Sequence, residues 1–113
     1  MKRLTCKPRP DKETSILIGA GVRTKLAAEL QNISQDNTVL ALVDPEVRQL
    51  HPSIIHDDWQ CIEVAGGEAC KSFRTLEDVL RQMAQRRLDR NTVLVAIGGG
   101  TIGDLGGLVA TLY

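Results

Sequence analysis

The feature that most constrains this chain is a glycine-rich segment that follows an apolar run. Six of the ten glycines lie between Gly98 and Gly107, directly after a β-branched stretch at residues 92–97. That stretch is typical of a buried parallel strand, and the apolar residues beyond the glycines recur at helical spacing. At a strand–turn–helix junction, free backbone N–H groups and the positive end of the helix dipole favour an anion. The segment therefore predicts a turn that binds phosphate, most often that of a nucleotide.

Strand and helix patterns alternate along the whole chain. Apolar runs predict strands at residues 15–18, 38–43, 61–64 and 92–97. Helical patterns follow them at residues 22–33, 45–50, 73–83 and 105–112. Strands that alternate with helices imply a parallel sheet joined by right-handed crossovers. We therefore expect an α/β fold, a Rossmann-like parallel sheet with helices on both faces, and a proline-containing loop at residues 7–11.

The third predicted helix is amphipathic. Its apolar stripe consists of Phe73, Leu76, Leu80 and Met83. Glu77 and Arg81 lie on the opposite, charged face as an i, i+4 pair, which contributes only about 0.2–0.5 kcal/mol and therefore marks the solvent side.

Composition excludes several classes of protein. The 113 residues are 42% hydrophobic and 25% charged, as in an ordinary single domain. Basic and acidic residues are equal in number and only three residues are aromatic, which argues against nucleic-acid or anionic-lipid partners. The basic start lacks the apolar region of a secretory signal, and no run is long enough to span a membrane. We expect a cytoplasmic protein with reduced thiols at Cys6, Cys61 and Cys70.

Two glycine turns compete as the phosphate site. The turn from Gly19 to Thr24 matches only part of the dinucleotide fingerprint, whereas Gly98, Gly100 and Gly103 match G-x-G-x-x-G in full. We favour the second turn; the alternative is that its glycines only allow tight strand–helix packing. Neither turn carries the G-K-[ST] of a P-loop.

Two aspartates are candidate ligand-binding residues. Asp44 follows the second predicted strand, where a carboxylate can accept from ribose hydroxyls and repel a 2′-phosphate, favouring NAD over NADP. An equally good alternative is a helix N-cap before Pro45. Asp104 follows the glycine turn, and we favour a ligand contact over a plain interaction with the helix dipole.

The loop after the third strand carries Glu68 and Lys71. The carboxyl ends of parallel strands converge on ligands, so both residues could face the same crevice as the glycine turn; a surface salt bridge is the alternative. His51 and His56 are poorly spaced for one metal ion, and we assign them no role.

The last predicted helix extends to Tyr113 without a glycine or basic C-cap. We expect it to be cut off and covered by a missing segment. Small residues at Gly106, Gly107 and Ala110 suggest burial on more than one side.

Together these motifs resemble one family. The element Gly67-Glu68-x-x-Lys71 is followed about 27 residues later by Gly98-Gly-Gly-Thr-Ile-Gly-Asp-Leu-Gly-Gly, and this pair is similar to the N-terminal half of 3-dehydroquinate synthases. The resemblance implies a lyase of the shikimate pathway that uses NAD and zinc or cobalt. Such enzymes convert 3-deoxy-D-arabino-heptulosonate 7-phosphate to 3-dehydroquinate and phosphate, with transient oxidation of a substrate alcohol by NAD.

The resemblance also assigns roles to individual residues. It implies that Gly99, Gly100, Thr101, Gly103 and Asp104 hold the pyrophosphate and the nicotinamide-side ribose. It implies that Asp44, Glu46, Gly67, Glu68 and Lys71 surround the adenosine side. Many relatives have aspartate in place of Gly66 and asparagine in place of Glu46.

The family's metal ligands and substrate-binding residues are expected beyond residue 113. We therefore expect residues 1–113 to be an incomplete NAD-binding domain of a two-domain enzyme, inactive alone and homodimeric at full length, whose substrate is a phosphorylated sugar acid. Alternatives are another sugar phosphate cyclase, a glycerol- or polyol-phosphate dehydrogenase that releases NADH, or an isolated nucleotide-binding module.

Overall fold

The computed structural model describes residues 1–33 and 37–113, and the chain divides into two compact units, Met1–Ile33 and Ser34–Tyr113. The first unit contains β1 (Lys2–Arg9), β2 (Lys12–Ile18), the 3-10 turn η1 (Val22–Lys25) and α1 (Leu26–Ile33). The second contains β3 (Val39–Val43), α2 (Pro45–Leu50), η2 (Pro52–Ile54), β4 (Gln60–Glu63), η3 (Glu68–Cys70), α3 (Phe73–Gln85), β5 (Val93–Ile97) and α4 (Gly100–Leu112).

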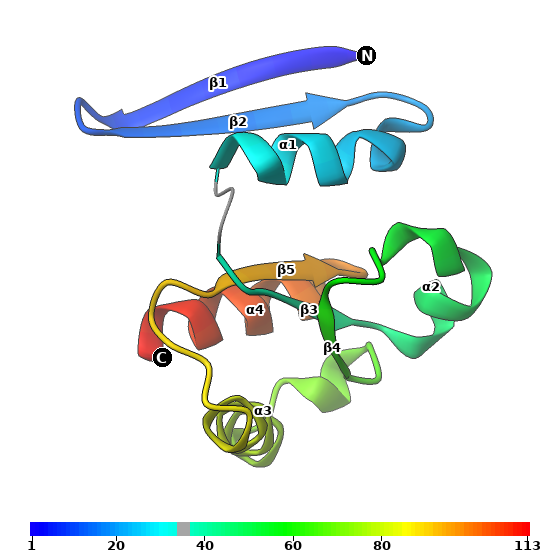
Figure 1. Cartoon of the computed structure of the whole chain (residues 1–113), viewed down its shortest axis with the longest axis vertical. Helices are drawn as coiled ribbons and strands as arrows, with labels where there is room; N and C mark the ends of the chain where they lie inside the picture. Colours follow the sequence, from blue (N-terminus) through cyan, green and yellow to red (C-terminus); the bar gives the residue numbers. More distant parts are fainter. Residues whose placement is uncertain (34–36) are drawn as a thin grey trace. The chain divides into compact units, whose positions relative to one another are not determined.

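The first unit is an antiparallel hairpin followed by a helix (Figure 1). The predicted loop at residues 7–11 is wrong for its first part, because β1 extends to Arg9 and only Pro10 and Asp11 form the turn. The strand predicted at residues 15–18 pairs antiparallel with β1 and does not belong to the parallel sheet. Proline is tolerated in an edge strand, and the register shifts between Cys6 and Arg9, around Pro8. Pro8 therefore indicated a loop in the sequence although it lies within β1.

An ion pair ties the hairpin to its helix within this unit. Arg3 Nη2 lies 2.6 Å from Glu29 Oε1, which joins β1 to α1. The hydrogen bond from Arg3 lowers the pKa of the Glu29 carboxyl below its usual range. The pair is solvent-exposed, so it contributes little to the stability of the unit.

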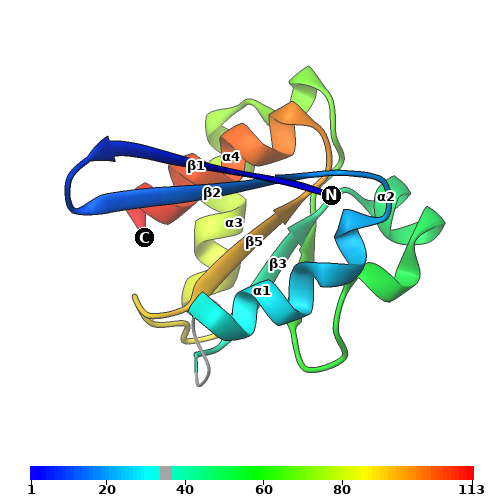
Figure 2. The same cartoon turned by 90° about the horizontal axis from the view of Figure 1, so that it is seen from above.

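The second unit confirms the predicted α/β class, with a parallel sheet flanked by helices. Its strands lie in the order β4-β3-β5, and both pairings are parallel. Figure 2 shows β3 and β5 side by side with their arrowheads pointing the same way. Because β3 is the central strand, its residues Leu40 to Val43 are fully buried.

One apolar core lies between this sheet and two helices. The buried cluster comprises Leu40, Leu42, Ile62, Val64, Cys70, Val79, Met83, Leu88, Ile102, Leu105 and Val109. The predicted stripe of α3 is confirmed at Met83, and Leu76 and Leu80 pack against the cluster. Phe73 is 91% exposed, so its assignment to the core is wrong. It is the first residue after the N-cap Ser72, whereas the buried residues of this helix, Val79 and Met83, lie further along it.

The charged side of α3 and the cysteines are as predicted. Glu77 and Arg81 form an ion pair on the exposed face of α3. All three cysteines are free, and burial raises the pKa of the Cys61 thiol, which keeps it in the weakly nucleophilic protonated form. Within residues 1–33 and 37–113, no helix has the length and apolar character needed to cross a bilayer.

Among the residues that the structure describes, α4 is buried on one side. Ile102, Leu105, Gly106 and Val109 face the core, whereas Leu108 and Leu112 are largely exposed. Burial on more than one side, which the small residues suggested, is therefore not seen in the described residues. Tyr113 packs against the core and donates a hydrogen bond to the carbonyl of Leu88.

Two adjacent glycines of α4 provide a matched test of helix–sheet packing. A Cβ on Gly106 would lie 2.9 Å from the Cβ of Ala96, so Gly106→Ala must push α4 away from β5 at a cost of about 1–3 kcal/mol. A Cβ on Gly107 meets nothing within 4 Å, so Gly107→Ala gains only helix propensity, about 1 kcal/mol. Urea denaturation should rank Gly107→Ala above wild type and Gly106→Ala below it. Equal stabilisation by both substitutions would show that α4 has room at Gly106.

Candidate functional site

Three loops meet at the carboxyl edge of the parallel sheet, as expected for strands that run parallel. Asp44 follows β3, and its backbone N–H donates to the carbonyl of Ile97 at the end of β5 (3.0 Å). A Cβ on Gly66, after β4, would lie 2.3 Å from Asp44 Oδ2, and a Cβ on Gly98 would lie 3.3 Å from Asp44 Cβ. Asp44 therefore occupies the space that the two glycines leave between the loops.

The Asp44 carboxylate acts as the N-cap of α2. Its Oδ1 accepts a hydrogen bond from the backbone N–H of Glu46 at 2.9 Å, and Pro45 starts the helix. The N-cap interpretation is thus confirmed, and it uses one oxygen only. Oδ2 faces Gly66, so one carboxylate can cap the helix and still accept from a ligand. Glu46 lies in the first turn of α2 and is exposed.

The predicted strand–turn–helix junction is present after β5. Gly99 is the N-cap of α4 without a side-chain cap, and the first backbone bond of the helix runs from Gly103 N–H to the Gly99 carbonyl (3.2 Å). The N–H groups before Gly103 therefore have no carbonyl partner within the helix. These donors, at the positive end of the dipole of α4, form an anion-binding geometry.

The glycines of this junction fall into two groups. The difference between them bears on whether the turn serves tight strand–helix packing or phosphate binding. A Cβ on Gly98 would approach Ile102 Cγ1 to 2.8 Å, so packing requires glycine there. Cβ atoms at Gly99, Gly100 and Gly103 would meet nothing within 4 Å. Tight packing explains the first position and leaves the other three unexplained. Their bare backbone faces open space, where a phosphate can approach closely.

The competing turn at Gly19 has a packing role. A Cβ on Gly19 would lie 2.9 Å from the Cα of Met1, and Gly21 has a φ of +70°, which favours glycine. The 3-10 turn η1 follows it directly, and α1 begins only at Leu26. The turn at Gly19 is therefore explained by packing, and the choice of the second turn as the phosphate site stays a prediction.

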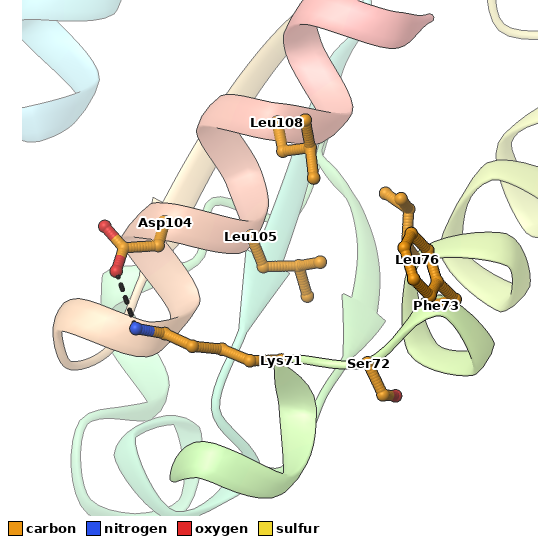
Figure 3. Close-up of a pocket in the computed structure, with 7 residues that line it drawn as sticks. All are labelled: Lys71, Ser72, Phe73, Leu76, Asp104, Leu105 and Leu108. Carbon is orange, nitrogen blue, oxygen red and sulfur yellow. Dashed lines mark ion pairs between the residues drawn. The ribbon is translucent and has the colours of Figure 1, made fainter.

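Two contacts join the loop after β4 to the N-terminal part of α4. Lys71 Nζ lies 3.0 Å from Asp104 Oδ2 (Figure 3) and 4.0 Å from Glu68 Oε1. The backbone N–H of Gly67 donates to Thr101 Oγ1 at 3.2 Å. The structure thus brings Gly67 and Lys71 into contact with α4, whereas Glu68 lies near Lys71 as in the exposed salt bridge that was the alternative. Sequence reasoning did not foresee which residues form pairs.

The Lys71 ion pair is poorly suited to a stabilising role. Its hydrogen bond to Asp104, with the added charge of Glu68, raises the pKa of Lys71. The pair is therefore intact below the usual lysine value of 10.5 and is lost as the pH rises through the raised value. The side chains of Lys71 and Asp104 are 43% and 70% exposed, and such exposed pairs contribute little to stability. Both side chains are accessible to a ligand.

A groove beside this ion pair was not predicted. It has a volume of about 390 Å³ and lies between α3 and α4 (Figure 3). Its lining consists of Lys71, Ser72, Phe73, Leu76, Asp104, Leu105 and Leu108. Sequence reasoning assigned Phe73 to a core stripe, although its position directly after the N-cap was a signal that it could be exposed.

Metal-binding groups are not clustered in the described residues. Within residues 1–33 and 37–113, no group of three or more His, Cys, Asp or Glu side chains could hold a metal ion. His56 Nδ1 accepts from the backbone N–H of Asp58, and His51 ends α2.

Known proteins resemble this chain in sequence and in fold. A family model described as 3-dehydroquinate synthase N-terminal matches residues 61–113. The 3-dehydroquinate synthase of Listeria welshimeri is 39% identical over 89 residues, which cover 74% of this chain and 24% of that protein. The chain belongs to the 3-dehydroquinate synthase family. The enzyme of Methylacidiphilum infernorum is 28% identical over 110 residues, covering 92% of this chain and 31% of the relative.

A solved structure has the same fold as this member of the 3-dehydroquinate synthase family. It is a 2-deoxy-scyllo-inosose synthase complexed with carbaglucose-6-phosphate, NAD+ and Co2+. The match has a TM-score of 0.75 and 18% identity, and it covers 99% of this chain and 32% of the other. The chain spans about a quarter to a third of the length of these relatives.

Proposed function

We propose that this chain is the dinucleotide-binding part of a 3-dehydroquinate synthase and that it holds NAD at the carboxyl edge of its parallel sheet. The observation that carries the proposal is the open backbone at Gly99, Gly100 and Gly103, which packing does not require. Relatives named 3-dehydroquinate synthase support this activity, and the related inosose synthase was crystallised with NAD+. In the full protein, NAD would transiently take a hydride from a substrate alcohol.

The residues at the sheet edge fit the parts of a dinucleotide. The N–H groups of Gly100, Thr101 and Ile102 would donate to the pyrophosphate, because they precede the first bond of α4. Asp104, just after this first turn of α4, would accept from the nicotinamide-side ribose hydroxyls. Lys71 would offset the negative charge of the ligand once it separates from Asp104.

The adenosine side would lie near the loops that follow β3 and β4. Asp44 would accept from a ribose hydroxyl through Oδ2, and Gly66 leaves the space that this oxygen occupies. Gly67, Glu68 and Glu46 would border the same region. Zinc or cobalt would be held by residues outside this chain, together with the groups that bind the phosphorylated sugar acid, so no catalytic step is assigned to residues 1–113.

A comparison of NAD with NADP tests this proposal. Calorimetric titration should show that the chain binds NAD and binds NADP at least about tenfold more weakly, because Asp44 would repel a 2′-phosphate. Asp44→Asn should reduce this preference without loss of stability, since asparagine caps helices as well as aspartate does. Absence of NAD binding, or equal affinity for both dinucleotides in wild type and variant, would contradict the assigned site.

A further inference from the structure

The two contacts between α4 and the loop after β4 differ in what a ligand would do to them. Lys71 and Asp104 are held together by an exposed ion pair of 3.0 Å, and in the proposed function both turn to the dinucleotide. Thr101 precedes Asp104 by three residues and so lies on the same face of α4. Its contact with Gly67 involves no charged ligand-binding group, so it can persist when the ion pair opens.

Gly67 is well placed to control the turn that carries the ligand-binding side chains. Its φ of +92° favours glycine, and its N–H donates to Thr101 Oγ1 at 3.2 Å. Its carbonyl accepts from Cys70 N–H at 3.1 Å, and Glu68 accepts in the same way from Lys71 N–H at 3.0 Å. The turn is thus internally bonded from Gly67 to Lys71, and fixing its first residue fixes the start of the whole turn.

Thr101 contributes a hydroxyl that accepts this hydrogen bond and that serine would retain. A hydroxyl has two acceptor lone pairs and one donor, so accepting from Gly67 leaves its proton available. Thr101 is half-buried, and the following residue, Ile102, is fully buried in the core, so the hydroxyl is held on a rigid helix turn. Valine has the same shape as threonine and lacks this hydrogen bond, which allows the contact to be removed with little change in packing.

We propose that Thr101 is a positioning residue that acts through Gly67, holding the Glu68–Lys71 turn against the N-terminus of α4 while Lys71 and Asp104 separate to receive a dinucleotide. The inference rests on the proposed function for its ligand. The contact itself, between Thr101 Oγ1 and Gly67 N–H, exists without the ligand and can be tested without it.

Thr101→Val and Thr101→Ser test this role in the full chain. NMR hydrogen exchange at the Gly67 amide, measured without ligand, should be about three- to tenfold faster in Thr101→Val, as expected for one lost hydrogen bond. Calorimetry should show about the same three- to tenfold loss of NAD affinity in that variant. Thr101→Ser should resemble wild type in both measurements, and thermal melting should be similar for all three proteins.

The outcomes separate this inference from the proposed function. Unchanged Gly67 exchange in Thr101→Val would overturn the contact, and faster exchange with unchanged NAD affinity would overturn the positioning role. A serine variant that behaves like valine would also overturn it, because the hydroxyl would not be the active group. If wild type binds no NAD, the proposed function fails, and the exchange measurement still decides whether Thr101 holds the loop.

Discussion

Replacement of Gly98 by alanine is expected to destabilise the folded chain by about 3 kcal/mol, a large part of the stability of a small domain. The new Cβ would lie 2.8 Å from Cγ1 and 3.1 Å from Cβ of Ile102, a side chain that is fully buried and cannot move aside. Gly98 also has a φ of +157°, outside the range that side chains readily adopt. The change should be measured as a shift in the midpoint of urea unfolding followed by circular dichroism.

Gly100→Ala is the matched control for Gly98→Ala. It adds the same atom two residues away, where nothing lies within 4 Å, and at the first position of α4 alanine is a good helix former. Its stability should equal or slightly exceed that of wild type. If Gly98→Ala were as stable as Gly100→Ala, the division of these glycines into packing and open positions would be wrong.

Much of the parallel unit was predictable because its signals are local. Residues 92–97 are an apolar run of strand length, and the glycines and helical spacing that follow come directly after it in the chain. The antiparallel hairpin was missed because its pairing depends on contacts between β1 and β2 rather than on either segment alone. Pro8 signals a loop in most contexts, and only the edge position of β1 makes it acceptable.

The sequence could predict where in the fold the site residues lie, but it could not predict which of them contact each other. The carboxyl ends of parallel strands meet at one edge, which places Asp44, Lys71 and Asp104 in neighbouring loops. Sequence alone could not show that Lys71 pairs with Asp104 or that Gly67 donates to Thr101, because these contacts depend on how two loops fold against each other. It also could not show at which glycines an added Cβ would clash with neighbouring atoms and at which it would meet open space.

Asp104→Ala is expected to weaken NAD binding about ten- to hundredfold, since hydrogen bonds to a charged group contribute about 1.5–3 kcal/mol. An opposing effect exists, because the substitution releases Lys71 from its ion pair and leaves the lysine free for the phosphates. An exposed ion pair is worth only about 0–1 kcal/mol, so the lost ribose contacts should dominate. Calorimetric titration of NAD into wild type and variant measures the difference.

The control for Asp104→Ala is Asp78→Ala on the exposed face of α3, where the aspartate accepts a hydrogen bond from Gln82. Both substitutions remove one exposed carboxylate, so both should change the free energy of unfolding by less than about 1 kcal/mol. Only Asp104→Ala should change the affinity for NAD. Equal affinities in both variants would reduce Asp104 to a carboxylate that interacts with the dipole of α4, and stronger binding in Asp104→Ala would show that its main effect is to restrain Lys71.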